Sequence, residues 1–238
     1  MIEDNIILES IKEAEEEQGF TFLDHQIDII KKSINNGNIV IIYGKAGTSK
    51  TTLSRALLKI YKNLGCRIGA VALSAKAAQR ITEATGFPAS TIHRMLGAKS
   101  LNEFIYNEEN PLPLDVILID ECSMINARLF YDLIQAIKPG TKVIMCGDDK
   151  QLPPIGFGNI FSNLLNKKEL FNINQLTKVL RQAEKSGILM DANKIREGIN
   201  PIQYPELKII HGELKDMYYM FRTKCEDLNN IAMLFGQV

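Results

Sequence analysis

The chain has 238 residues, and its 28 Lys and Arg balance its 28 Asp and Glu. This length suits one sizeable domain with small insertions, and two full domains would be crowded. The charge balance excludes a protein that is basic throughout, so any nucleic-acid site must be a local patch. No apolar run approaches the roughly 18 residues of a membrane span, and the acidic N-terminus lacks the regions of a signal peptide. We therefore expect a cytoplasmic protein without a membrane partner.

The cysteines at positions 66, 122, 146 and 225 are widely spaced and form no CxxC pair. Such spacing indicates neither a zinc site nor a disulfide framework. We therefore expect these cysteines to be small core residues.

Two amphipathic helices are predicted in residues 1–36, which we interpret as leading into the main domain. Apolar residues recur at helical spacing over 4–18 and again over 24–35. Asp24 is the expected N-cap of the second helix, and Asn36-Gly37 would end it.

The segment 44–51 reads Gly-Lys-Ala-Gly-Thr-Ser-Lys-Thr and lies between an apolar run over 39–43 and a helical pattern. Strand, glycine-rich turn and helix in this order are typical of a P-loop, in which backbone N–H groups and the positive end of a helix bind a triphosphate. Lys50 would contact the β- and γ-phosphates, and the Thr51 hydroxyl would bind Mg²⁺. The expected ATP-binding residues of this segment are Gly44, Ala46, Gly47, Thr48, Ser49, Lys50, Thr51 and Thr52.

One residue departs from the P-loop pattern GxxxxGK[ST], which has glycine before the lysine. Here that residue is Ser49. The position often requires a backbone conformation that costs a non-glycine residue on the order of 1 kcal/mol. Ser49 therefore bears on nucleotide affinity more than on the class of nucleotide.

Strands and helices alternate along the chain after the P-loop. Strands are predicted over 67–73, 116–119 and 142–145, and helices over about 75–85, 90–96 and 127–137. This alternation favours an α/β fold with a doubly wound parallel sheet flanked by helices, whose ligands bind beyond the carboxyl ends of the strands. We expect this domain to cover residues 37–198.

A charged, Asn-rich segment with two prolines interrupts the alternation over about 98–114. We predict a short inserted β-hairpin there, which projects from the domain. From about residue 199 the pattern weakens, and a strand over 217–221 and a helix over about 226–234 are expected.

Two adjacent carboxylates, Asp120 and Glu121, follow the apolar run over 116–119 directly. In a chain with a P-loop, such a pair at a strand end indicates a metal and water site. Asp120 would bind Mg²⁺, and Glu121 would orient or deprotonate the attacking water. A simple helix cap is the alternative for an isolated acid pair.

Gln151 lies in the polar segment 147–154, which follows the next predicted strand. Its amide could hydrogen-bond both the γ-phosphate and the water, and would then sense whether that phosphate is present. The alternative is a surface turn that the two prolines of this segment end.

Together these motifs resemble those of the RecD-like DNA helicases of superfamily 1B, which include the Dda-type phage helicases. The resemblance covers about 20–200 and implies a RecA-like P-loop ATPase that couples MgATP hydrolysis to translocation on single-stranded DNA, 5′ to 3′. The segment 21–26 resembles the one that reads adenine, which implies that Gln26 binds ATP. The segment 176–182 resembles the motif whose arginine, here Arg181, contacts the γ-phosphate. The implied catalytic residues are Lys50, Glu121, Gln151 and Arg181.

Residues 72–78 and 89–94 resemble the single-strand-contacting motifs of this family, although Leu73-Ser74-Ala75 stands where the family has Pro-Thr-Gly. Hydroxyls and cations at strand and helix ends suit phosphate contacts, whereas a lone histidine such as His93 is more often structural. The implied DNA-binding residues are Ser74, Lys76, Thr91, His93, Arg94 and Pro153, with Pro154 and Phe157 nearby.

The predicted hairpin occupies the place of the strand-separating pin of the family. Its aromatic residues, Phe104 and Tyr106, have two open interpretations. They act as wedges, or they cover the base of a surface hairpin.

A motor of this family needs two RecA-like domains, because ATP binds between them. The chain supplies the first, and we expect 199–238 to be the start of the second. The isolated chain should then bind MgATP and single-stranded DNA without unwinding duplex. The resemblance also implies subunits of a helicase–nuclease as partners.

Two alternative functions stay open. One is a nucleotide-dependent DNA-binding or partner-docking module without turnover, which Ser49 and the absent second domain support. The other is a small-molecule P-loop kinase. It is disfavoured because no lid-like arginine cluster follows the P-loop.

Overall fold

The computed structural model describes residues 4–19, 21–45, 47–100, 103–177, 186–201, 208–211, 213–214 and 217–220. The chain divides into two compact units, unit 1 (1–178) and unit 2 (179–238). This division falls earlier in the chain than residue 198, where the sequence placed the end of the ATPase domain.

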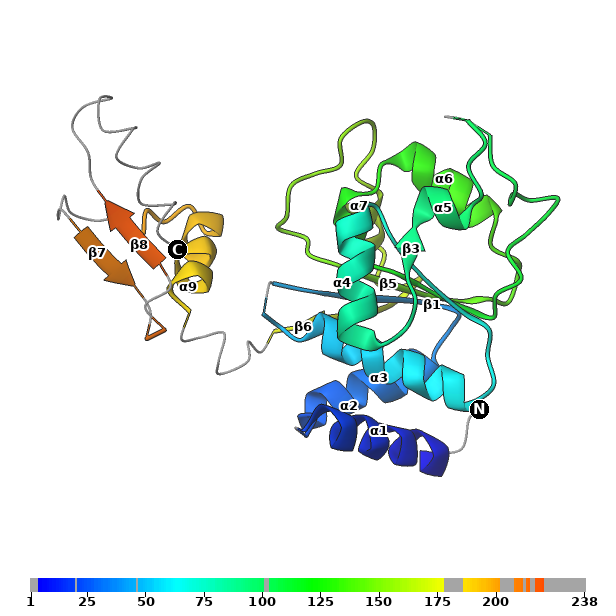
Figure 1. Cartoon of the computed structure of the whole chain (residues 1–238), viewed down its shortest axis with the longest axis horizontal. Helices are drawn as coiled ribbons and strands as arrows, with labels where there is room; N and C mark the ends of the chain where they lie inside the picture. Colours follow the sequence, from blue (N-terminus) through cyan, green and yellow to red (C-terminus); the bar gives the residue numbers. More distant parts are fainter. Residues whose placement is uncertain are drawn as a thin grey trace. The chain divides into compact units, whose positions relative to one another are not determined.

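Unit 1 is built on a six-stranded sheet in which every pair of neighbouring strands is parallel (Figure 1). The strand order is β3-β2-β4-β5-β1-β6. The strands are β1 (Ile39–Gly44), β2 (Ile68–Ala72), β3 (Ser90–Thr91), β4 (Val116–Ile119), β5 (Lys142–Gly147) and β6 (Asn172–Leu176). The predicted parallel α/β sheet is confirmed, and all its carboxyl ends lie at one edge.

The central strands β1, β4 and β5 are mostly apolar because both of their faces are covered. Val40 and Ile42 of β1 belong to one buried cluster, while Ile41 between them belongs to the other. All three side chains are 0% exposed. The sheet is therefore the middle layer of unit 1, with a core on each side.

Helices form the outer layers. The first core is covered by α1 (Asp4–Gln18), α2 (Asp24–Asn35), α3 (Lys50–Asn63) and α4 (Ala75–Thr85). The second is covered by α5 (Ile92–Met95), the 3₁₀ turn η1 (Cys122–Met124), α6 (Ala127–Gln135) and α7 (Ile160–Leu165). No helix in the described part of the chain has the length and apolar character that crossing a membrane requires.

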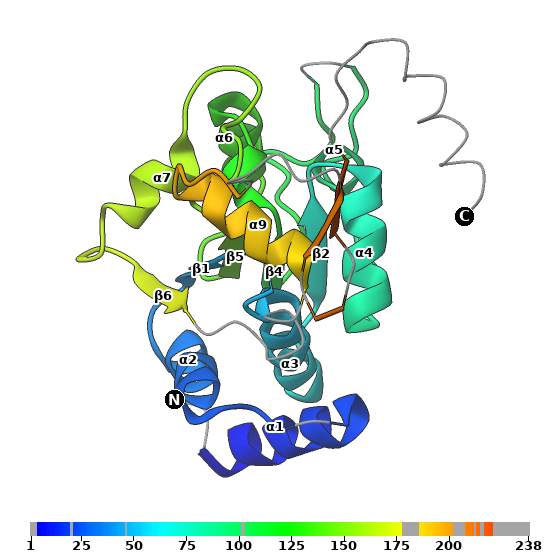
Figure 2. The same cartoon turned by 90° about the vertical axis from the view of Figure 1, so that its left-hand side faces the viewer.

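The helix α1 lies outermost, with α3 between it and the sheet (Figures 1 and 2). Its apolar side is buried, with Ile7, Ile11 and Ala14 at 0%, 3% and 0% exposure. The predicted helices over 4–18 and 24–35 are thus confirmed, and α1 is an integral part of unit 1.

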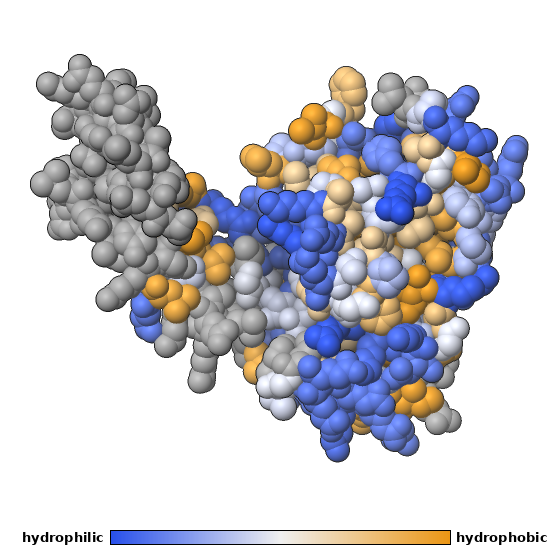
Figure 3. Space-filling view, viewed as in Figure 1, coloured by the Kyte–Doolittle hydropathy of each residue, from blue (hydrophilic) through white to orange (hydrophobic). Residues whose placement is uncertain are grey.

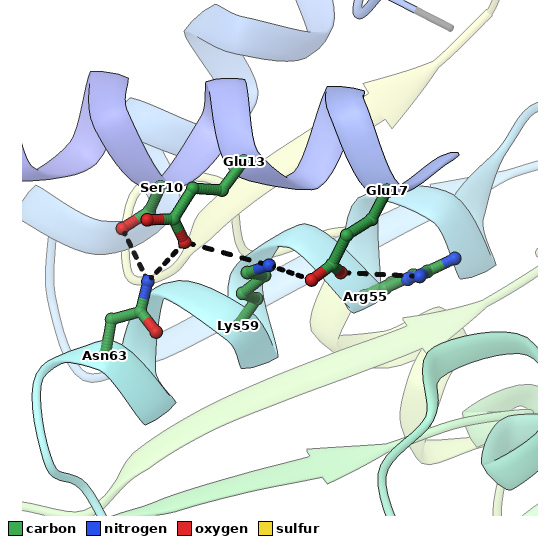
Figure 4. A network of polar contacts seen from close by, with 6 residues as sticks. All are labelled: Ser10, Glu13, Glu17, Arg55, Lys59 and Asn63. Carbon is green, nitrogen blue, oxygen red and sulfur yellow. Dashed lines mark hydrogen bonds and ion pairs between the residues drawn. The ribbon is translucent and has the colours of Figure 1, made fainter. Parts of the chain in front are cut away.

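Polar contacts also join α1 to α3 (Figure 4). Lys59 of α3 forms ion pairs with Glu17 and, at 3.7 Å, with Glu13. Asn63 Nδ2 donates a hydrogen bond of 3.1 Å to Glu13, and Arg55 pairs with Glu17 at 3.5 Å. The hydrogen bond from Lys59 lowers the pKa of Glu17. These contacts fix α1 along the helix that begins at the P-loop.

The N-cap of α2 is Leu23, and the prediction of Asp24 was wrong. The side chain that completes the helix start is Gln26, whose Oε1 accepts the N–H of Leu23 at 2.9 Å. An amide at this position can satisfy a free backbone donor of the first turn as well as a side chain at the cap does.

The inserted hairpin is shorter than predicted. Antiparallel pairing joins Ala98 to Phe104 as an isolated bridge, with further backbone bonds from Ile105 to Gly97 and from Tyr106 to Leu96. The rest of the segment returns to the domain as a loop without a second strand in its described residues. Two prolines prevent a continuous ladder there, because proline has no backbone donor.

In unit 2 the structure describes α9 (Gly187–Arg196) and an antiparallel pair of strands, β7 (Lys208–His211) and β8 (Met217–Met220). The strand predicted over 217–221 agrees with β8. The helix predicted over 226–234 lies outside the described residues.

The cysteines behave as expected where they are described. Cys122 and Cys146 are buried, and Cys66 is half-buried against the first core. Cys225 lies outside the described residues.

Candidate active site

The P-loop follows β1 and requires glycine at its first position. A Cβ atom on Gly44 would lie 2.5 Å from the carbonyl oxygen of Leu176 in β6 and 2.7 Å from Thr48 Oγ1. Gly47 has a φ of 80°, which favours glycine as well. Thr48 Oγ1 donates to the carbonyl of Lys45 at 2.7 Å and closes the turn. The loop therefore packs tightly around its own backbone.

Lys50 is the first residue of α3, and its side chain folds back over the loop. Its Nζ donates to the carbonyl oxygens of Gly44 at 2.5 Å and Lys45 at 3.1 Å. The ammonium group is thus held at the N-terminus of a helix, where backbone donors and the helix dipole also favour an anion. This donor set fits the phosphates of a nucleotide.

Ser49 has the left-handed backbone conformation that its position in the pattern suggested, with φ 67° and ψ 26°. It is the N-cap of α3, yet its side chain makes no capping hydrogen bond. Its Oγ is buried and has no hydrogen-bond partner within the described part of the chain. The residue therefore combines an unfavourable backbone conformation with an unsatisfied hydroxyl.

Asp120 lies directly beyond β4, and its N–H donates to Val71 of the neighbouring strand at 2.9 Å. Its Oδ1 accepts the N–H of Glu121 at 2.8 Å. Burial raises the pKa of Asp120, while the bond from Glu121 and the positive charge of Lys50 act in the opposite direction. A cation bound here would favour the charged carboxylate further. Asp120 and the P-loop lysine therefore lie at the same edge of the sheet, where the positive charge of Lys50 acts on the carboxylate.

Glu121 also has a left-handed backbone, with φ 53° and ψ 37°. Such a conformation costs a non-glycine residue about 1–3 kcal/mol and occurs often at active sites. It turns the chain sharply from β4 into η1. Nothing in the sequence pattern indicated this feature.

The loop after β5 carries Gln151, and a side-chain hydrogen bond joins it to the loop after β4. Ser123 Oγ donates to Gln151 Oε1 at 3.2 Å. The backbone of the turn is fixed by Asp148, whose Oδ1 accepts the N–H of Lys150 at 3.0 Å and whose carbonyl accepts that of Gln151. Sequence reasoning missed Ser123, although it follows the predicted carboxylates closely.

Ser54, on the buried side of α3, connects this helix to β5. Its Oγ donates to the carbonyl of Lys50 at 3.0 Å and lies 3.3 Å from Cys146 Sγ. Burial raises the pKa of Cys146 to about 12, so this thiol stays protonated at neutral pH and serves packing.

Among the other predicted nucleotide contacts, Thr51 is exposed and Thr52 half-buried in the first turn of α3. Gln26 is 4% exposed and its Oε1 is already engaged by the cap of α2. Ala46 and Arg181 lie outside the described residues.

Two of the predicted DNA contacts are helix N-caps. Ser74 Oγ accepts the N–H of Ala77 at 3.1 Å, and Thr91 Oγ1 accepts that of Arg94 at 3.2 Å. Ser74 follows β2 and Thr91 is the last residue of β3, so both lie at the same edge of the sheet as the P-loop. Lys76, His93, Arg94 and Pro153 are exposed.

The aromatic residues of the insertion cover its base. Phe104 and Tyr106 both pack against the second core, and the rings of Phe104 and His93 are 6.2 Å apart. Of the two interpretations that the sequence left open, the structure favours this one.

The loop after β5 also carries exposed apolar side chains. Leu152, Ile155 and Phe157 are 79%, 92% and 94% exposed. The carbonyl of Phe157 accepts the N–H of Ala127, which fixes the loop to the start of α6. Figure 3 shows apolar groups on the edge of unit 1 where this loop lies in Figure 1.

Comparisons with known proteins agree with the geometry. A family described as an AAA domain matches residues 21–212. The ATP-dependent RecD2 DNA helicase of Deinococcus radiodurans is 37% identical over 163 residues, which are 68% of this chain and 22% of that protein. The RecBCD enzyme subunit RecD of Haemophilus influenzae is 38% identical over 149 residues, which are 52% of this chain and 23% of that protein. The chain thus spans about a quarter of the length of these relatives.

Solved structures show the same fold. The Pif1 helicase from Candida albicans matches with a TM-score of 0.55 and 22% identity, over 76% of this chain and 45% of that one. At this level of identity the likeness concerns the architecture of the P-loop domain.

Proposed function

Since this chain belongs to the AAA domain family and is a RecD-like helicase motor domain, we propose that it couples MgATP hydrolysis to movement along single-stranded DNA. By resemblance to the RecD-like helicases, the direction of translocation would be 5′ to 3′. One observation carries the proposal: β1 and β4 lie parallel on either side of β5, so the P-loop and the carboxylates after β4 are at the same carboxyl edge of the sheet.

In the proposed site, Lys50 and the backbone donors at the start of α3 bind the phosphates of ATP. The Thr51 hydroxyl and the Asp120 carboxylate bind Mg²⁺, which prefers oxygen ligands of this kind. The metal would neutralise charge on the transferred phosphoryl group. On binding, the Lys50 ammonium group would exchange its hydrogen bonds to the Gly44 and Lys45 carbonyls for contacts with the phosphates.

Glu121 is proposed to orient or deprotonate the attacking water, and Gln151 to sense the γ-phosphate. The hydrogen bond from Ser123 holds the Gln151 carbonyl oxygen, so its amide N–H₂ would be left to donate to the phosphate. Arg181 would add a positive charge beside the γ-phosphate, as the resemblance of segment 176–182 to the family motif implies.

DNA is proposed to bind along the part of the edge formed by the ends of β2 and β3. Exposed Lys76, His93 and Arg94 would contact phosphates there. The hydroxyls of Ser74 and Thr91 act mainly through their caps, which hold the first turns of α4 and α5. Phe157 after β5 would give bases an aromatic surface on which to stack.

A complete motor would also need the second RecA-like domain. The segment 199–238, proposed as its start, falls within unit 2. We propose that the isolated chain binds MgATP and single-stranded DNA but does not unwind duplex. Subunits of a helicase–nuclease are proposed as further partners, because one relative is named as a RecBCD subunit.

A second candidate function is a nucleotide-dependent binding module without turnover. One observation favours it: the Oε1 of Gln26 is engaged by the cap of α2. An amide held in this way would be less available to the adenine base, which would lower the affinity for ATP.

The test compares ATP hydrolysis by the purified chain with and without oligo-dT, in parallel with nucleotide binding by thermal shift. Glu121→Gln should keep MgATP binding and lower DNA-stimulated hydrolysis by about 10²–10⁴-fold, the range for loss of a general base. Glu109→Gln is the matched control, because it removes one exposed charge away from the P-loop. Its hydrolysis rate should equal that of the wild type.

The outcomes separate the two functions. Stimulation by oligo-dT that Glu121→Gln abolishes supports the motor. MgATP binding without hydrolysis supports the binding module, and absence of MgATP binding contradicts both.

A further inference from the structure

Ser49 carries two unfavourable features that glycine at the same position would not have. Its backbone is left-handed, with φ 67°. Its hydroxyl is buried without a hydrogen-bond partner among the described residues. Buried hydroxyls in folded proteins nearly always have a partner, and the exceptions are concentrated where a ligand or a functional step supplies one.

The polar groups around Ser49 have their own partners. Thr48 Oγ1 and Lys50 Nζ both donate to the carbonyl of Lys45, and the carbonyl of Ser49 accepts the N–H of Leu53. Ser54 Oγ donates to the carbonyl of Lys50. Among the side chains just named, the Ser49 hydroxyl is the one without a hydrogen-bond partner in the described part of the loop. Ser49 is the N-cap of α3, the helix end where phosphate is proposed to bind.

We propose that the Ser49 hydroxyl donates a hydrogen bond to a phosphate oxygen of the bound nucleotide, so that serine here increases nucleotide affinity. This inference rests on the proposed function, since it names a specific contact in the same site. The backbone N–H groups of a P-loop surround the α- and β-phosphates, so the residue before Lys50 meets the diphosphate part of the ligand. ADP and ATP should therefore depend on Ser49 equally.

Ser49→Gly and Ser49→Ala separate the two features. Glycine removes both the left-handed strain and the hydroxyl, whereas alanine keeps the strain and removes only the hydroxyl. In the nucleotide-free chain both should raise the midpoint of thermal unfolding, glycine more than alanine. Both should weaken binding of MgADP and of a non-hydrolysable MgATP analogue by about tenfold or more, the usual effect of losing a hydrogen bond to a charged group.

The experiment measures these two quantities on the same protein samples, by calorimetric titration and by thermal unfolding without nucleotide. Ser100→Ala is the control, because Ser100 is exposed and lies outside the site. A higher unfolding midpoint together with weaker binding is the expected result. Either variant binding both nucleotides as tightly as the wild type would overturn the inference and leave the proposed function intact. A wild-type chain that binds neither nucleotide would overturn both.

Discussion

Ile7 offers a sharp test of whether α1 belongs to the folded P-loop domain. Its side chain is 0% exposed and packs in the first core, whereas its neighbour Leu8 on the same helix is 45% exposed. Replacing a buried isoleucine by alanine costs about 2–5 kcal/mol through lost burial and the cavity left behind. The better helix propensity of alanine returns less than ~1 kcal/mol of that. We expect Ile7→Ala to lower the free energy of unfolding by roughly 3 kcal/mol.

Circular dichroism is the suitable probe, because the chain has no tryptophan. For a domain of this size roughly 3 kcal/mol corresponds to a decrease of about 6–12 °C in the unfolding midpoint. Leu8→Ala, a change of the same size on the solvent side, should shift the midpoint by less than about 2 °C. Equal midpoints for the two variants would refute the packing of α1 described above.

Two further predictions concern charge and the site. Lys142 is 8% exposed, and burial lowers its pKa to about 8 from 10.5 in an exposed lysine. Between these two pH values the unfolded chain binds a proton at Lys142 that the folded chain lacks, so the free energy of unfolding should rise with pH from about 8 to 10.5. Urea unfolding at a series of pH values measures this rise, and Lys142→Met should abolish it. Ser123→Ala should free Gln151 and lower DNA-stimulated ATP hydrolysis several-fold with little change in the affinity for MgADP, and an unchanged rate would exclude a role for that hydrogen bond.

The parallel sheet could be predicted because it depends on local patterns, and the same patterns place the candidate site at one edge of it. Buried strands such as 116–119 are continuous apolar runs, and the carboxyl ends of parallel strands must meet at one edge. A P-loop and an acid pair at two such ends are therefore brought together whatever the detailed packing. This reasoning predicts that Lys50 and Asp120 act at the same edge of the sheet.

The features that escaped prediction depend on contacts between distant residues or on alternatives of similar energy. The bond between Ser123 and Gln151 joins two loops whose relative position is set by β4 and β5 together. The start of α2 had two polar residues able to satisfy its donors, and Gln26 did so in place of Asp24. Such choices differ by about 1 kcal/mol, which a local pattern does not resolve.

The hydrogen bond from the Asp120 N–H to Val71 gives the domain a short mechanical path. Val71 belongs to β2, which ends just before Ser74 and the first turn of α4. The backbone of the proposed metal ligand is thus hydrogen-bonded directly to the strand that leads into the proposed DNA-contacting segment. In the strand order β4 lies between β2 and β5, so the chain beyond β4 is flanked by the segment that carries Ser74 on one side and by the loop that carries Gln151 on the other.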